Sequence, residues 1–195
     1  MSRFSQMVRN TNETKINLSF ELDGKGVFSG SSGVRFLDHM LELFTKHGRF
    51  DLAVQCQGDI DVDAHHSVED IGICLGLMIK EALGDKQGVV RYATTFTPMD
   101  EALSRICIDI SNRSFLVFDA IFTNDRVGDL PTELVEEFFR AVAFNAGLTL
   151  HMAVEYGKNN HHMIEALFKR FGRALRDATR VDASIEGVLS TKGQL

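Results

Sequence analysis

The sequence predicts an α+β fold of two similar β-β-α-β-α halves, with sheets packed on a central layer of helices. The same order of alternating and helically spaced apolar residues occurs twice along the chain. A five-residue pattern also recurs 96 residues apart, as HHSVE at 65–69 and HHMIE at 161–165. No low-complexity linker divides the chain, so we expect one domain, residues 1–195, with halves of about 1–97 and 98–195.

In the first half, apolar residues alternate over 16–22, which predicts a strand. The Asp-Gly-Lys-Gly segment at 23–26 predicts a hairpin turn into a short strand near Val27. Helical spacing of apolar residues predicts a helix over about 34–47, which ends at Gly48. A strand over 50–54 follows, and HHSVE then opens a second helix.

The second half repeats these elements. Residues 106–110 alternate as a strand, Ser111-Asn112 turns the chain, and a strand returns over 115–121. A helix is expected to begin at Pro131, and Gly147 is matched to Gly48. Residues 148–154 then alternate as a strand, and HHMIE opens the last helix. Residues of about 89–97 are interpreted as a connecting strand.

We call the two copies the first pentad (65–69) and the second pentad (161–165). In a helix, residues four apart share one face, so His65 points with Glu69 and His161 with Glu165. The middle histidines, His66 and His162, leave the helix in a different direction. Imidazole nitrogen combined with carboxylate oxygen favours divalent ions such as Mn, Fe, Co or Zn. A polar helix start is the alternative interpretation, but two copies at matching places favour two metal ions.

Two further histidines lie one element from a pentad. His39 shares a helix face with His47, and His151 is expected to point away from the apolar face of its strand. Two histidines and one glutamate from each pentad, with His39 and His151, give eight ligands for two metal ions. Four protein ligands per ion leave positions open for a substrate. The pentads are expected to meet either within one chain or across a subunit interface.

Composition narrows the class of protein. The formal net charge is -6, which argues against a nucleic-acid surface. Cys56, Cys74 and Cys107 form no CxxC motif and indicate reduced thiols in the cytoplasm. The first residues lack the apolar run of a signal peptide, and no apolar stretch is long enough to span a bilayer.

The chain resembles the imidazoleglycerol-phosphate dehydratase family from about Arg9 to its C-terminus. Five segments carry the resemblance: FLDHML at 36–41 with HG at 47–48, DAHHSVEDIG at 63–72, PMDEAL at 98–103, HHMIEALFK at 161–169 and STKG at 190–193. The resemblance implies a fold like domain 2 of ribosomal protein S5. It implies a cytoplasmic lyase of histidine biosynthesis that dehydrates D-erythro-imidazole glycerol phosphate to imidazole acetol phosphate.

The same resemblance implies two Mn(II) ions per active site that bind the substrate as an imidazolate, and a homo-oligomer of twenty-four chains with sites at interfaces. One ion would be held by His65, Glu69, His151 and His162, and the other by His39, His66, His161 and Glu165. His39 and His151 could exchange places between the two sets. Neither nucleic acid nor membrane is an expected partner.

Matching positions also imply roles in substrate binding and catalysis. Glu13 matches a mobile glutamate of the family and is the first candidate for proton transfer, with Glu165 and Asp100 as further catalytic candidates. The phosphate would be bound by Arg91, Arg113, Lys169, Ser190 and Lys192, with Glu13 also contacting the substrate.

The chain departs from the family pattern in two places, the first of which is the turn at 111–114, Ser-Asn-Arg-Ser instead of the usual Ser-Gly-Arg-Pro. Asn112 stands where the family usually has Gly, but Asn tolerates the left-handed conformation, so the turn is expected to survive. Leu43 stands where glutamine is common. Two other functions compete with the dehydratase: a dinuclear metal-dependent phosphohydrolase, which would release phosphate, and a metal-binding assembly module without catalysis.

Overall fold

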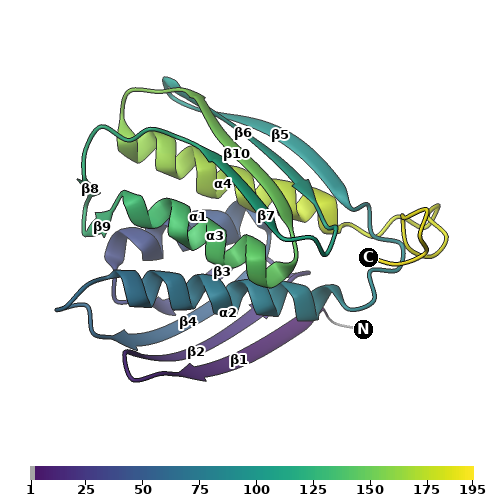
Figure 1. Cartoon of the computed structure of the whole chain (residues 1–195), viewed down its shortest axis with the longest axis horizontal. Helices are drawn as coiled ribbons and strands as arrows, with labels where there is room; N and C mark the ends of the chain where they lie inside the picture. The colour runs from purple at the N-terminus through teal and green to yellow at the C-terminus, as the bar shows by residue number, and fades with distance from the viewer. Residues whose placement is uncertain (1–2) are drawn as a thin grey trace.

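The computed structural model describes residues 3–195 as two four-stranded sheets with four helices between them (Figure 1). The first half contains β1 (Phe4–Asn10), β2 (Thr14–Glu21), β3 (Val27–Ser31), α1 (Arg35–Gly48), β4 (Asp51–Gly58) and α2 (His65–Leu83). The second contains β5 (Tyr92–Met99), β6 (Ala102–Asp109), β7 (Phe115–Asp119), β8 (Arg126–Val127), β9 (Leu130–Pro131), α3 (Glu133–Ala146), β10 (Thr149–Tyr156) and α4 (Asn160–Thr179). The duplicated β-β-α-β-α order and the central helical layer are confirmed, with one additional strand at the start of each half and the short β8 and β9 before α3.

Each half begins with an edge strand that the sequence reading did not place in a sheet. The orders β1-β2-β4-β3 and β5-β6-β10-β7 are equivalent, so β5 is the counterpart of β1. The connecting strand expected at 89–97 is thus the edge of the second sheet. β1 carries few buried residues and no clear apolar alternation, which explains why its pattern was missed.

The prediction of a hairpin turn at 23–26 is wrong. β2 and β3 do not pair, because β4 lies between them and pairs antiparallel with β2 and parallel with β3. The Asp-Gly-Lys-Gly segment does turn the chain, but β3 lies on the far side of β4 rather than next to β2. β6, β10 and β7 repeat this arrangement in the second half.

The helix boundaries refine two further expectations. α3 begins at Glu133, two residues after Pro131, which lies in β9. Gly147 is the left-handed residue that follows α3, with a φ of 71°, and its counterpart after α1 is Arg49, with a φ of 55°, rather than Gly48. Asn112 has a φ of 54°, as the substitution for Gly requires.

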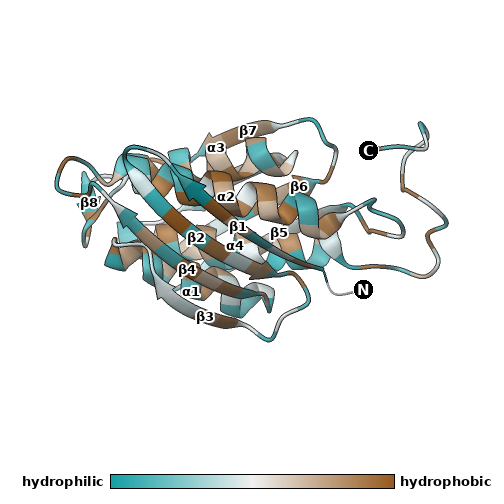
Figure 2. Ribbon diagram, turned by 90° about the horizontal axis from the view of Figure 1, so that it is seen from below, coloured by the Kyte–Doolittle hydropathy of each residue, from teal (hydrophilic) through white to brown (hydrophobic). Residues whose placement is uncertain are grey.

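One apolar core joins both sheets to the helices, with Phe20, Phe44, Phe138, Phe168 and Phe171 fully buried in it. The sheet of the first half, seen from below in Figure 2, shows hydrophilic and hydrophobic residues alternating along its strands. α1 packs on α4 and α2 packs on α3, so each helix pair combines the two halves. None of the helices within residues 3–195 is long and apolar enough to cross a membrane.

Candidate functional site

Both pentads lie at helix N-termini at the same end of the molecule (Figure 1). α2 begins at His65, and α4 begins at Asn160, where the side chain of Asn159 accepts the amide of His161 at 2.9 Å and caps the helix. The sequence therefore orients two histidines from the first turn and a glutamate from the second turn of each helix.

The second pentad is part of a three-residue group of potential metal ligands. His39 on α1 and His161 and Glu165 on α4 have donor atoms that all lie within 4.8 Å of one another. Nε2 of His161 is 3.1 Å and Nε2 of His39 is 4.0 Å from Oε2 of Glu165. Within residues 3–195 this is the one such group of three or more side chains. It depends on the packing of α1 against α4, because its donors come from both helices.

Glu165 is buried, and its charge is balanced by a neighbouring cation. The ammonium of Lys169, one turn further along α4, contacts Oε1 of Glu165. Burial alone would raise the pKa of Glu165, but Lys169 and His161 offset it and hold that pKa below its usual value. Lys169, which the sequence assigns to phosphate, thus lies against a candidate metal ligand.

The first pentad provides a pair of donors rather than a group of three. Nε2 of His65 is 3.8 Å from Oε2 of Glu69, one turn along α2. His66 is held by its other ring nitrogen, since Nδ1 lies 3.0 Å from Oδ1 of Asp59. Nε2 of His66 faces Glu13, whose Oε1 is 3.8 Å away in the β1–β2 turn.

His162 in the second pentad is held in the same manner by a different carboxylate. Its Nδ1 lies 2.7 Å from Oε2 of Glu101, and its Nε2 lies 3.7 Å from Oδ2 of Asp100. Both acids belong to the β5–β6 turn. His151 lies elsewhere, exposed on the face of β10 that points away from the helices, between the buried Leu150 and Met152.

These contacts change the protonation of the middle histidines. The hydrogen bond to Asp59 raises the pKa of His66, and the hydrogen bond to Glu101 raises the pKa of His162. In return, the hydrogen bond from His162 lowers the pKa of Glu101 to about 2, helped by the backbone amides of Asn159 and Lys158. In both imidazoles a carboxylate holds Nδ1, and Nε2 lies on the other side of the ring.

Sequence reasoning missed Asp59 and Glu101 as the partners of these histidines. The strand registers show that Glu101 is the counterpart of Glu13, because the β1–β2 and β5–β6 hairpins have the same length and pairing. Recognition of β1 and β5 as equivalent strands would have revealed Glu101. Asp59 has no comparable signal in the sequence.

Four of the five residues predicted to bind phosphate line one cavity of about 890 Å³. We call this cavity the cradle, and it is lined by Arg91, Tyr92, Arg113, Ser184, Ile185, Glu186, Val188, Leu189, Ser190, Thr191 and Lys192. Arg91 is buried and fixed, with Nε 2.7 Å from Oδ1 of Asp109 and Nη1 2.7 Å from the carbonyl oxygen of Leu189. The hydrogen bond to Asp109 raises the pKa of Arg91, so this cation is permanent.

The cradle and the pentads lie at opposite ends of the molecule. The amide of Arg91 donates to the carbonyl of Ala178 near the C-terminal end of α4, whereas His161 lies in its first turn. Seventeen residues separate His161 from Ala178, which is about 26 Å of helix. Figure 1 shows the C-terminal segment at the far end from the first turns of α2 and α4.

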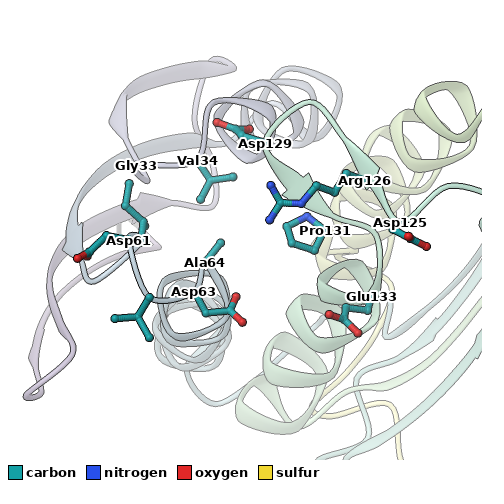
Figure 3. A pocket seen from close by; sticks show the side chains of 12 residues that line it. Gly33, Val34, Asp61, Asp63, Ala64, Asp125, Arg126, Asp129, Pro131 and Glu133 are labelled. Carbon is teal, nitrogen blue, oxygen red and sulfur yellow. The ribbon is translucent and has the colours of Figure 1, made fainter.

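A second cavity, of about 680 Å³, lies between the starts of α1, α2 and α3 (Figure 3). Its charged lining is mainly acidic, from Asp61, Asp63, Asp125, Asp129 and Glu133, with Arg126 as its one cation. Asp129 accepts the backbone amides of Arg35 and Phe36 and so caps α1. This excess of negative charge disfavours a phosphate, whereas the charged lining of the cradle is mainly cationic, from Arg91, Arg113 and Lys192.

Comparison with known proteins places the chain in a family. The family model described as imidazoleglycerol-phosphate dehydratase matches residues 32–175. Proteins with that description from Acetivibrio thermocellus and Alkaliphilus metalliredigens are 58% and 55% identical, each over 100% of both chains.

Solved structures agree with the sequence matches. The crystal structure of imidazoleglycerol-phosphate dehydratase from Staphylococcus aureus subsp. aureus N315 has a TM-score of 0.84 and 45% identity, over 92% of this chain and 99% of that one. The structure named IGPD from Pyrococcus furiosus has a TM-score of 0.82 and 34% identity, over 97% and 100%. The chain therefore belongs to the imidazoleglycerol-phosphate dehydratase family.

Proposed function

We propose that this enzyme of histidine biosynthesis dehydrates imidazole glycerol phosphate at sites built from the pentads of one chain and the cradle of another. The reaction removes a proton from one carbon and a hydroxyl from its neighbour, and the resulting enol becomes the ketone of imidazole acetol phosphate. The phosphate is retained. The observation that carries the proposal is the group of His39, His161 and Glu165 at the end of the molecule opposite the cradle.

The residues at the pentads fit a divalent metal ion such as Mn(II). Their donor set is imidazole nitrogen and carboxylate oxygen. Metal-binding histidines commonly place their second ring nitrogen against a carboxylate, and Asp59 and Glu101 provide this for His66 and His162. A bound ion would act as a Lewis acid and favour the deprotonated form of the substrate's imidazole.

We assign the ligands to two sets, one for each of two ions in the site. One set is His39, His161 and Glu165 with His66, and the other is His65 and Glu69 with His151 and His162. His66, His151 and His162 lie outside the group that the single chain brings together. The exposed position of His151 on the outer face of β10 supports its use as a ligand in another subunit's site.

Around the metal ligands, acidic side chains handle protons and the cradle binds the phosphate. Glu13 is exposed and lies close to His66, and we assign it to proton transfer, with Asp100 beside His162 and Glu165 in supporting roles. Arg91, Arg113, Ser190 and Lys192 offer cationic and hydroxyl donors to phosphate oxygens. Lys169 balances the charge of Glu165 and is the nearest of the phosphate-binding candidates to the metal ligands.

The separation of these two regions requires more than one chain. A three-carbon chain joins the imidazole of the substrate to its phosphate, which is far too short to cover about 26 Å of helix. A cradle must therefore meet the pentads of a neighbouring chain, which makes a homo-oligomer necessary for catalysis. The family resemblance suggests twenty-four chains. Residues 1–195 act as one domain in this scheme, because helices from both halves share one core.

The family assignment favours the dehydratase over a dinuclear phosphohydrolase or a metal-binding module without catalysis. A biosynthetic enzyme with three free thiols also fits the cytoplasm. The deciding test is turnover of imidazole glycerol phosphate by metal-stripped protein, before and after addition of Mn(II), with sedimentation of both samples. We expect ketone formation only with Mn(II), together with a large particle.

Three other results would each contradict part of the proposal. Release of inorganic phosphate would favour the phosphohydrolase. Mn(II) binding without turnover would favour the module without catalysis. Full turnover by a monomer would exclude sites that are shared between chains.

A further inference from the structure

The two halves differ in how they anchor the hairpin turn beside each pentad. Arg9, Thr14 and Asp70 form a hydrogen-bonded network in the first half. Nε of Arg9 is 2.8 Å from Oδ1 of Asp70, and the hydroxyl of Thr14 donates to Oδ2 of Asp70 at 2.5 Å. Asp70 and Thr14 are 6% and 1% exposed, so the network is largely out of water.

The second half forms the same elements without this network. The strand registers and the pentads make Thr97, Ala102 and Ala166 the counterparts of Arg9, Thr14 and Asp70. Ala102 and Ala166 are both fully buried, and the carbonyl of Ala166 accepts the hydroxyl of Ser104 instead. A buried ion pair is often no more stabilising than apolar packing of the same volume. The second half therefore forms the same elements without a counterpart of Asp70.

The network leads directly to the turn that carries Glu13. The hydroxyl oxygens of Thr14 and Thr11 are 3.1 Å apart. Oγ1 of Thr11 accepts the backbone amide of Glu13 at 3.1 Å and that of Thr14 at 2.9 Å. Asp70 is therefore joined to the backbone of Glu13 through two hydroxyl groups, although its own position is on α2 beside Glu69.

The turn in the second half is held by its own acid. Glu101 accepts the amides of Lys158 and Asn159 and contacts Nδ1 of His162. In the first half Asp59 takes over the contact with the middle histidine, so the carboxylate of Glu13 has no short contact with it. The backbone carbonyl of Glu13 accepts the amide of Asp59 at 3.2 Å, and the hydroxyls of Thr11 and Thr14 tie the same turn to Asp70.

We propose that Asp70 is a positioning residue that holds Glu13 over the first pentad through Thr14 and Thr11. This inference rests on the role of Glu13 in the proposed function. Asp70 itself is buried and hydrogen-bonded to Arg9 and Thr14, so we expect it to act through these side chains. A carboxylate that transfers protons must be placed within hydrogen-bonding reach, and a misplacement of about 1 Å can lower the rate about 100-fold.

The test replaces the network by the residues that the second half uses. The triple variant Arg9→Thr/Thr14→Ala/Asp70→Ala should fold, because the second half does so with Thr97, Ala102 and Ala166. We expect kcat to fall about 10- to 100-fold, with KM and Mn(II) content unchanged. Hydrogen exchange of amides 10–14 should become faster. Thr14→Ala alone should reproduce part of the loss, and Thr14→Ser, which keeps the hydroxyl, should restore it.

A double-mutant cycle with Glu13→Gln separates positioning from general stability. If Asp70 acts through Glu13, the triple substitution should cause no further loss of kcat in Glu13→Gln protein. An equal loss in both backgrounds would overturn the proposal, as would wild-type kcat in the triple variant while Glu13→Gln is impaired. Wild-type kcat in Glu13→Gln protein would instead overturn the role of Glu13 in the proposed function.

Discussion

At the scale of single residues, the pentads depend on carboxylates outside the pattern. His66 is oriented by Asp59 and His162 by Glu101, and these acids come from different places in the two halves. Asp59 follows β4, whereas Glu101 lies in a hairpin turn. The HHxxE spacing is set by one helix turn and can be read from sequence, but the carboxylates reach the histidines only through tertiary packing. Their role was therefore not predictable from spacing.

The pair of Glu101 and His162 predicts how Glu101→Gln changes the pH dependence of stability in metal-free protein. The folded pKa of Glu101 is about 2, below its ordinary 4.5, so its contribution is complete above about pH 4.5 and is lost as the pH falls toward 2. The folded pKa of His162 is raised, so its contribution is present below about pH 6.5 and is lost at higher pH.

The two contributions overlap between about pH 4.5 and 6.5. Thermal unfolding should therefore show the largest Tm difference between wild type and Glu101→Gln near pH 5.5 and a smaller one at pH 8. The difference should be small throughout, because the pair is solvent-accessible. A Tm difference that does not change between these two pH values would contradict the pairing of Glu101 with His162.

At the scale of elements, two glycines at equivalent positions set the helix spacing. A Cβ at Gly172 on α4 would lie 2.4 Å from the carbonyl oxygen of Phe44 on α1, and a Cβ at Gly76 on α2 would lie 2.7 Å from that of Val142 on α3. The two helix pairs thus cross at similarly close contacts. Only the α1–α4 crossing joins donors of the same metal-ligand group, since His39 lies on one helix and His161 and Glu165 on the other.

This difference predicts unequal effects of two matched substitutions. Overpacking should destabilise the Gly172→Ala and Gly76→Ala variants by about 1–3 kcal/mol each. The higher helix propensity of Ala should offset up to about 1 kcal/mol of this loss. Gly172→Ala should also weaken Mn(II) binding at the His39 group about tenfold, because α1 moves away from α4. Mn(II) titration of metal-stripped protein, with Tm measured in parallel, checks this. Equal loss of metal affinity in both variants would contradict the argument.

The elements themselves were predictable where local chemistry decides them. The strand over 16–22, the helices at the pentads and the left-handed Asn112 follow from periodicity and turn propensity. The pairing partner of β3 does not, because it depends on β4, which the chain reaches only after α1. A Gly-rich turn indicates a change of direction but not which strand will lie beside the next one.

At the scale of the whole molecule, the residues proposed to bind metal and those proposed to bind phosphate lie at opposite ends of the helices. The pentads occupy one end of the helical layer, and the cradle occupies the other, beside the C-terminal segment (Figure 1). The sequence indicated both sets of residues, but their separation became apparent only from the lengths of α2 and α4. This geometry allows a closed assembly in which each chain contributes metal ligands to one site and phosphate-binding groups to another.

Sites shared in this way predict complementation between two inactive variants. Glu165→Gln should lose a metal ligand and Arg113→Ala a phosphate contact, so each alone should have little activity. When the two are co-expressed with different tags and co-purified, random mixing should give about a quarter of the sites a wild-type Glu165 from one chain and a wild-type Arg113 from another. Turnover with Mn(II) should then recover to about a quarter of wild type, whereas the separately purified variants mixed without subunit exchange should stay inactive. If each site were contained in one chain, every site in the mixed assembly would carry one of the two defects, and co-expression would restore nothing.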